Sequence, residues 1–301
     1  MVATRLLTLP LALLLAGCGG GAETIDPTDG GTREPGITDA PAAPPSPEGE
    51  VVPQAPEVTP SPTGEPAPPP SAPATDITEP ATGEPPAETV TGYLEALAAT
   101  DDPDRMREGL HLTVEGSAAH ELLLHTSSIA QAWSDGGVAA PPTSLNRTDD
   151  GAELCPALGN DPDCGEYTGF TGRDTLVTGL HINGSDPGPS LIVGEDVTAD
   201  SEGVNATLIT AYRSVVDHAL VVTAEFEAAE DVSLDLEGTA YRAEDGSEQR
   251  VEDAAGRREL DAETATHAVF HLPDALPGGE LVVGGCLAEC SALVDLRLPV
   301  R

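Results

Sequence analysis

Two segments, ATLITAYR at residues 206–213 and ALVVTAEF at residues 219–226, decide the fold class of this chain. Each is a short run of strand-forming residues, and the link between them contains turn-forming Ser and Asp, so the two are predicted to be strands. Similar segments follow one another from Leu191 onward. Seven short strands at close spacing are typical of a β-sandwich, which is the fold predicted for residues 191–301. The seven candidates are Leu191–Val193, Ala206–Arg213, Ala219–Phe226, Val232–Tyr241, Ala265–Leu272, Leu281–Val283 and Ala292–Leu298.

The region before these strands begins with a helical period. Apolar residues recur at helical spacing from Val90 to Ala98, which predicts a short amphipathic helix. Asp102-Pro103 and Ser117 are residue types that begin helices, so a short second helix and a longer third helix are predicted after them. An α+β module of three helices and short antiparallel strands is therefore expected over residues 89–190. Its candidate strands are Ser144–Cys155, Glu166–Phe170 and Leu176–Ile182.

The order of these elements carries two resemblances. Helices followed by strands over residues 89–190 resemble the NTF2-like fold, and the strands of residues 191–301 resemble the immunoglobulin-like modules of extracytoplasmic bacterial lipoproteins. Both resemblances rest on element order, and neither assigns a functional residue.

The first eighteen residues carry a more specific pattern. Arg5 is followed by an apolar run from Leu6 to Leu15, which is shorter than the roughly 20 residues that span a bilayer, so residues 1–17 are interpreted as an export signal. The run ends in Leu15-Ala16-Gly17-Cys18, which resembles the lipobox of bacterial lipoproteins. This resemblance implies that Cys18 becomes the first mature residue, carries acyl chains and anchors the protein on the outer face of the cell membrane. The alternative is an ordinary cleavable signal with an unrelated Cys.

Residues 18–88 are predicted to be the lipidated Cys and a disordered tether. Of the 29 prolines, 18 fall between Glu23 and Glu88, and none of the aromatic residues does. Such a segment cannot bury enough apolar surface to offset its ordering entropy. About 70 residues would reach on the order of 200 Å as polyproline II and roughly 45 to 50 Å as a flexible coil. The expected function of this tether is to hold the head away from the membrane.

The charge of the chain excludes nucleic acid as a partner. It has 52 acidic residues and 13 basic ones, all of them Arg, for a net charge of -39. No basic cluster is larger than Arg257-Arg258, so the chain has no surface that could neutralise phosphates. Residues 89–301 hold 39 acidic residues and 11 Arg, a net charge of -28 by subtraction. This charge favours cationic partners, and the alternative is a compositional bias with no binding role.

The four cysteines after Cys18 are predicted to form local disulfides, because exported proteins with an even number of cysteines are usually oxidised. Cys155 and Cys164 flank a turn-rich loop, and Cys286 and Cys290 flank a short link between candidate strands. The alternative is a zinc site with four Cys ligands. Neither spacing is the C-x2-C pair typical of zinc sites, which favours structural disulfides.

One group of residues could hold a metal ion, and the histidines could not. Asn160, Asp161, Asp163 and Glu166 place hard oxygen ligands around the first cysteine loop, as calcium requires, although a chain this acidic gathers carboxylates by chance. The histidines lack a metal-binding spacing: His120 and His125 lie five apart on a helix, and His267 and His271 lie too far apart on a strand. Partly exposed histidines without a metal are expected, and no cofactor is predicted.

The sequence contains no motif of a known catalytic class, and no catalytic residue is assigned from it. The leading hypothesis is a lipid-anchored, non-enzymatic module that binds a protein or a small ligand beyond the membrane. The alternative is a small-molecule hydrolase or isomerase with a pocket in residues 89–190, using His111, His120 or Asp174. A third hypothesis is a structural role in the cell envelope.

Overall fold

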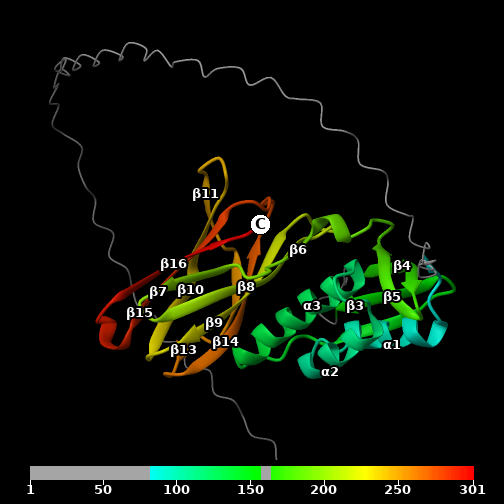
Figure 1. Ribbon diagram of the computed structural model, residues 1–301, viewed down its shortest axis with the longest axis horizontal. Helices are drawn as coiled ribbons and strands as arrows, with labels where there is room; N and C mark the ends of the chain where they lie inside the picture. Colours follow the sequence, from blue (N-terminus) through cyan, green and yellow to red (C-terminus); the bar gives the residue numbers. More distant parts are fainter. Residues whose placement is uncertain (1–81, 157–163) are drawn as a thin grey trace, which may run out of the picture. The chain divides into compact units, whose positions relative to one another are not determined.

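The computed structural model describes residues 82–156 and 164–301. After the two-residue strand β1 (Thr82–Gly83), three α-helices come first and antiparallel strands follow, in the predicted order (Figure 1). The predicted signal peptide, Cys18 and the predicted tether up to residue 81 lie outside the described residues. The helical elements are α1 (Ala87–Ala98), α2 (Pro103–Glu108), α3 (Ala118–Asp135) and the 3-10 turns η1 (Gly109–Leu112), η2 (Gly188–Ser190) and η3 (Ala288–Cys290).

Both predicted N-caps are confirmed. The Asp102 carboxylate accepts a hydrogen bond from the backbone N–H of Arg105 at 3.1 Å, and the Ser117 hydroxyl accepts one from that of His120 at 3.4 Å. Helix α1 follows Pro86 without a side-chain cap. Because α1 begins at Ala87, the predicted boundary between tether and head at residues 88 and 89 falls inside this helix.

Sheet 1 has five strands, in the order β1-β4-β3-β2, with β5 also paired to β4. The structure corrects one prediction here: Ser144–Cys155 is a hairpin of two strands. Its turn contains Asp149-Asp150-Gly151, and the Thr148 N–H donates to the Gly151 carbonyl oxygen at 3.1 Å. Asp and Gly favour turns over strand interiors, which explains the interruption. The strands of sheet 1 after β1 are β2 (Thr143–Arg147), β3 (Gly151–Pro156), β4 (Gly165–Arg173) and β5 (Leu176–Ile182).

The remaining strands form two further antiparallel sheets. Sheet 2 has the order β12-β14-β9-β8-β6, with β7 paired to β8, and sheet 3 has the order β11-β10-β15-β16, with β13 paired to β10. All seven predicted strands are present. Four further strands, β7, β11, β12 and β13, were not predicted, and each has four residues or fewer. The bounds are β6 (Leu191–Val193), β7 (Thr198–Ser201), β8 (Val204–Arg213), β9 (Leu220–Ala228), β10 (Val232–Arg242), β11 (Glu248–Arg250), β12 (Asp253–Gly256), β13 (Glu259–Leu260), β14 (Thr264–Leu272), β15 (Glu280–Leu287) and β16 (Leu293–Pro299).

Sheets 2 and 3 share one hydrophobic core. Phe226 and Phe270 of sheet 2 are fully buried in the same cluster as Leu281 and Leu296 of sheet 3. The two phenyl rings meet edge to face, with centroids 6.3 Å apart. Alternate residues of β8 and β9 point into this core, as expected for strands with one buried face.

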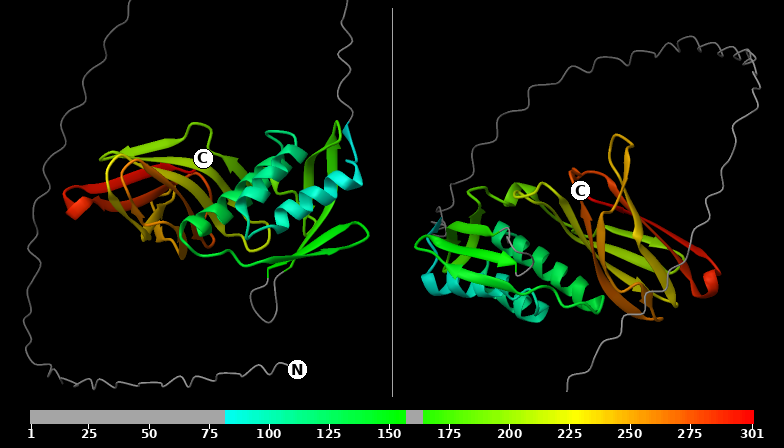
Figure 2. Two further views of the ribbon diagram at one scale, coloured as in Figure 1. Left: turned by 90° about the horizontal axis from the view of Figure 1, so that it is seen from below. Right: turned by 180° about the vertical axis from the view of Figure 1, so that it is seen from behind.

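Helix α3 lies between sheet 1 and the outer face of sheet 2 (Figures 1 and 2). Leu122 and Leu123 of α3 pack with Val177 of β5 in a second hydrophobic cluster. The same cluster contains Leu191 and Tyr212 of sheet 2. The described residues from Thr82 to Arg301 belong to one compact unit. The predicted module boundary at residues 190 and 191 therefore falls where the two halves share contacts.

A buried histidine joins α3 to sheet 2. His125 is only 2% exposed, and its Nδ1 atom lies 2.8 Å from Oγ1 of Thr210, which lies 2.7 Å from Oγ1 of Thr223. Burial lowers the pKa of His125 to about 3, so the ring is neutral at physiological pH. The expectation that the histidines are partly exposed is wrong for this residue.

Candidate functional site

An open groove of about 900 Å³ lies beside the first turns of α1. Four elements form it: β1, the N-terminal half of α1, the β2–β3 turn and the middle of β4. Its volume is within the range of small-molecule sites. The lining residues are Gly83, Glu84, Pro85, Ala87, Val90, Thr91, Leu94, Arg147, Thr148, Asp149, Asp150, Gly151, Gly169, Phe170 and Thr171.

The floor of this groove is apolar. Val90 and Leu94 are four residues apart on α1 and therefore face the same way. Opposite them, β4 has an irregular register with β5 between Thr168 and Thr171. Gly169 at this irregularity has a φ of +63°, and a Cβ there would lie 2.6 Å from His181 Nδ1, so glycine is required. Phe170 follows it and packs against Tyr93 with ring centroids 6.4 Å apart.

The rim of the groove is acidic. The Arg147 guanidinium donates to the Glu95 carboxylate at 2.8 Å and to the Thr91 hydroxyl at 3.4 Å, which fastens the β2–β3 turn to α1. Glu84, Asp149 and Asp150 are exposed at the edge, and no arginine of the described residues pairs with them. Because Glu95 already compensates the charge of Arg147, the three free carboxylates make the opening negative.

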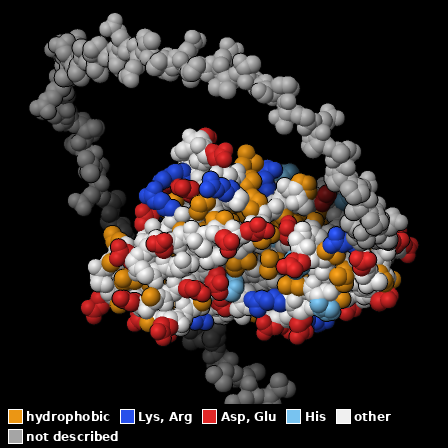
Figure 3. Space-filling model, in the orientation of Figure 1, with side chains coloured by type: hydrophobic (Ala, Val, Ile, Leu, Met, Phe, Trp, Pro, Cys, Tyr) orange, Lys and Arg blue, Asp and Glu red, His pale blue; other side chains and the backbone are white. Residues whose placement is uncertain are grey.

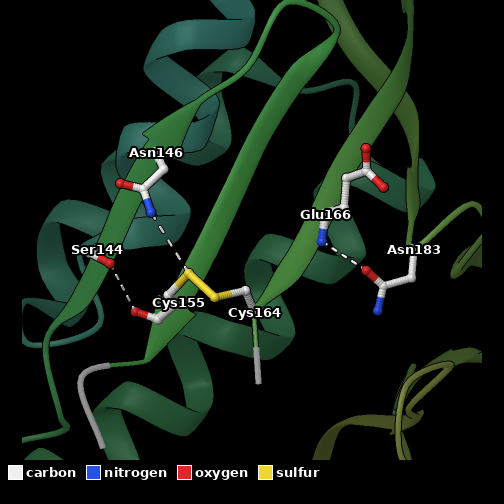
Figure 4. The surroundings of a disulfide bond; sticks show 6 residues. All are labelled: Ser144, Asn146, Cys155, Cys164, Glu166 and Asn183. Atoms are coloured by element: carbon white, nitrogen blue, oxygen red, sulfur yellow. Dashed lines mark hydrogen bonds between the residues drawn. A yellow bond between two sulfur atoms is a disulfide. The ribbon is translucent and has the colours of Figure 1, made fainter. Parts of the chain in front are cut away.

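The first predicted disulfide is present and lies on the same hairpin. Cys155 and Cys164 are bonded, with their Cα atoms 4.2 Å apart, as expected for residues that flank a turn (Figure 4). The Asn146 side chain points toward this disulfide, and the Ser144 hydroxyl donates to the Cys155 carbonyl oxygen at 3.3 Å. The disulfide therefore fixes the end of β3 that is opposite to the groove.

The second predicted disulfide joins Cys286 of β15 to Cys290 of η3, with Cα atoms 4.8 Å apart. It closes the link between β15 and β16. Since all four cysteines are oxidised, they have no thiolates to offer, and the alternative of a four-Cys zinc site is wrong.

Of the four predicted calcium residues, only Glu166 lies in the part of the chain that the structure describes. Asn160, Asp161 and Asp163 lie outside the described residues. The Glu166 carboxylate points away from the disulfide, while the Glu166 backbone N–H donates to Asn183 Oδ1 at 2.8 Å (Figure 4). Within residues 82–156 and 164–301, no three His, Cys, Asp or Glu side chains cluster as a metal site would require.

The three residues of the catalytic hypothesis do not line the groove. Nδ1 of His120 lies 2.9 Å from the Thr113 hydroxyl, and Nδ1 of His111 contacts the Glu108 carbonyl oxygen. Asp174 lies in the β4–β5 turn with a φ of +53°, a conformation that Asp tolerates. Within the described residues, no hydrogen bond or ion pair joins any two of the three.

His267 and His271 share the outer face of β14, as predicted, but each has its own acidic partner. The Asp135 carboxylate at the end of α3 lies 3.3 Å from Nδ1 of His267 and accepts the backbone N–H of His267 at 2.7 Å. His271 lies 3.8 Å from Glu252 and 4.0 Å from Asp217. The histidines of β14 thus interact with carboxylates from other elements.

The groove was not predicted from the sequence, although the sequence contains one signal of the turn at its edge. Asp-Asp-Gly at residues 149–151 is a turn signature inside the segment interpreted as a single strand.

No helix of the described residues is both long and apolar enough to cross a membrane. Comparison with protein-family models and with curated proteins gave no match, so a proposal about function rests on the residues themselves.

Proposed function

We propose that this chain is a lipid-anchored extracytoplasmic lipoprotein whose head binds a small ligand. The anchor rests on the pattern Leu15-Ala16-Gly17-Cys18 after a short apolar run. The Pro-rich residues 19–81 then serve as a tether that holds the head away from the membrane. The two disulfides support an oxidising compartment, since such bonds do not persist in the cytosol.

We also propose that residues 191–301 form an immunoglobulin-like sandwich and that the preceding module is NTF2-like. The strand orders β12-β14-β9-β8 and β11-β10-β15-β16 support the first assignment. They correspond to the D-E-B-A and C′-C-F-G orders of immunoglobulin domains, with β6, β7 and β13 as additional strands. The succession of three helices and sheet 1 supports the second.

The observation that carries the binding proposal is the groove beside α1, with its apolar floor and acidic rim. A ligand that fits it has an apolar body, which Val90, Leu94 and Phe170 accommodate, and a positive charge near Asp149 and Asp150. Burial of the apolar body supplies most of the free energy of binding, and the exposed carboxylates supply selectivity. No lining residue favours the hydrolase or isomerase hypothesis.

The anchor is tested by labelling with palmitate in a bacterium that expresses the chain. We expect the wild-type protein to carry the label and the Cys18→Ala variant to carry none. Cys155→Ala is the matched control and should keep the label, because it removes a different cysteine. Label that persists in Cys18→Ala contradicts the anchor.

The groove is tested by calorimetry on residues 18–301 with Cys18→Ser, a variant that has no sulfur at position 18 to carry an acyl chain. Octylammonium is expected to bind more tightly than octanol or octanoate. Asp149→Asn combined with Asp150→Asn should weaken octylammonium binding by about threefold or more and leave octanol binding unchanged. Glu202→Gln with Glu230→Gln removes the same charge elsewhere on the surface and serves as the control. Equal binding of octanoate and octylammonium argues against the proposed ligand class.

A further inference from the structure

A second groove lies between the end of α3 and the outer face of sheet 2. It has a volume of about 420 Å³ and shares no lining residue with the groove beside α1. The helix contributes one wall, and β9, β12, β14 and the residue before β12 contribute the other. The lining residues are Ile129, Trp133, Val221, Glu252, Asp253, Ala254, Ala255, Val269 and His271.

Trp133 is the single tryptophan of the sequence, and it lines this groove. Trp133 and Ile129 both lie on α3, and both are only partly buried. They lie four residues apart and face Val221 and Val269 of sheet 2 across the groove. A large aromatic ring is therefore accessible above an aliphatic floor.

The open side of the groove is acidic. Glu252 and Asp253 are exposed, and in residues 82–156 and 164–301 no arginine pairs with either of them. His271 lies 3.8 Å from Glu252 and 4.0 Å from Asp217, which are longer than hydrogen bonds. The carboxylates of Glu252 and Asp253 can therefore still accept hydrogen bonds from a ligand.

We propose that this groove binds an alkylammonium group. The cation would lie between the Trp133 ring and the carboxylates of Glu252 and Asp253, and its alkyl chain would lie against Val221 and Val269. The face of a tryptophan ring attracts cations, and carboxylates accept the N–H hydrogen bonds of an ammonium group. An apolar floor selects a cation with a hydrocarbon chain over an inorganic ion. Free polyamines and lysine side chains both present this chemistry.

The position of the tryptophan supplies the test, because its fluorescence reports on this groove alone. Residues 18–301 with Cys18→Ser are titrated with n-butylammonium chloride, with NaCl at equal ionic strength, and with n-butanol. We expect a saturable change in emission with butylammonium only. The same change with NaCl would overturn the proposal. Spermidine and an acetylated, amidated Gly-Lys-Gly peptide then distinguish a free polyamine from a lysine side chain as the ligand. Binding of either one supports the proposal. If butylammonium, spermidine and the peptide all fail to bind, the proposal is overturned.

Two matched pairs of substitutions separate a site from a general effect of charge. Glu252→Gln with Asp253→Asn should weaken butylammonium binding by about fivefold or more. Glu227→Gln with Glu263→Gln removes the same charge from a pocket of about 440 Å³ that has no tryptophan, and should change butylammonium binding much less. Equal weakening by the two pairs would overturn the proposal. Asp149→Asn with Asp150→Asn should leave the tryptophan signal unchanged, so a failure of the first groove does not decide the second.

Discussion

His125 shows at the scale of one residue how a polar group is accommodated inside this fold. Its imidazole lies 5.5 Å from the Tyr212 ring, and its Nδ1 atom is close to the Thr210 hydroxyl. If the buried ring were charged, it would lose its hydration and would have no carboxylate beside it to compensate the charge. Burial therefore keeps the ring neutral and lowers its pKa to about 3. In the unfolded chain the same ring titrates near its ordinary pKa of 6.5.

This difference predicts a loss of stability in acid. Between the two pKa values, the unfolded chain binds a proton at His125 and the folded chain does not, so the free energy of unfolding falls as pH falls below about 6.5. The contribution of His125 should be about 2 kcal/mol between about pH 7 and pH 5. Urea unfolding of wild type and His125→Gln at both pH values measures it. The wild type should lose more stability than the variant; equal losses would contradict the assignment.

Two adjacent glycines of β15 predict opposite outcomes for the same substitution. A Cβ at Gly285 would lie 2.5 Å from the carbonyl oxygen of Ser233, whereas a Cβ at Gly284 would meet nothing within 4 Å. Gly285→Ala should therefore destabilise the protein by about 1 to 3 kcal/mol, because the backbone of β10 must move. Gly284→Ala should leave stability unchanged or slightly increased, because alanine reduces the entropy of the unfolded chain. Thermal unfolding of the two variants checks the difference, and similar melting temperatures would contradict it.

At the scale of elements, helix caps and long apolar runs predicted the helices and the longer strands correctly, whereas short polar strands gave no clear signal in the sequence. The helical period and the caps at Asp102 and Ser117 predicted α1, α2 and α3, because caps act within one turn. The longer strands were predicted from their apolar runs. The hairpin turn at Asp149 was missed, as were the polar strands of two to four residues, which depend on neighbours for their hydrogen bonds.

Neither groove could be predicted, because each is made by elements that are distant in the sequence. Asp135 and His267, for example, are 132 residues apart and meet only after α3 has packed on sheet 2. Trp133 lies on α3 and His271 on β14, and no pattern in the sequence places the two in one groove. Convergence of this kind follows from tertiary packing, whereas periodicity reports only on single elements.

The attachment of α3 to sheet 2 gives a prediction at this scale. Asp135 is 16% exposed, and its carboxylate accepts from the backbone N–H of His267 and from the Gln131 amide at 2.6 Å. Asp135→Ala leaves the His267 N–H without its acceptor and should cost about 1 to 3 kcal/mol of stability. Asp104→Ala is the matched control, since Asp104 is 87% exposed and its pair with Arg107 is solvated. Urea unfolding should separate the two variants; equal midpoints would contradict a role for Asp135.

At the scale of the whole molecule, the described surface is crowded with carboxylates. Figure 3 shows acidic side chains scattered across one face, with fewer basic ones among them. Residues 89–301 hold 39 acidic residues and 11 Arg, so most carboxylates have no arginine to pair with. Burial, together with the negative charge of Glu195, raises the pKa of Glu121. Like-charge repulsion therefore opposes the folded state while favouring the cationic ligands proposed for both grooves.

This repulsion predicts that salt stabilises the protein. Raising NaCl from about 0.01 M to about 0.15 M shortens the screening length from roughly 30 Å to roughly 8 Å, which weakens repulsion between exposed carboxylates more than it weakens the few ion pairs at contact distance. The free energy of unfolding of residues 18–301 with Cys18→Ser should rise by on the order of 1 kcal/mol. Glu195→Gln with Glu230→Gln removes two exposed charges and should reduce this salt dependence. Urea unfolding at the two salt concentrations measures both effects, and a wild type that loses stability in salt would show that ion pairs outweigh the repulsion.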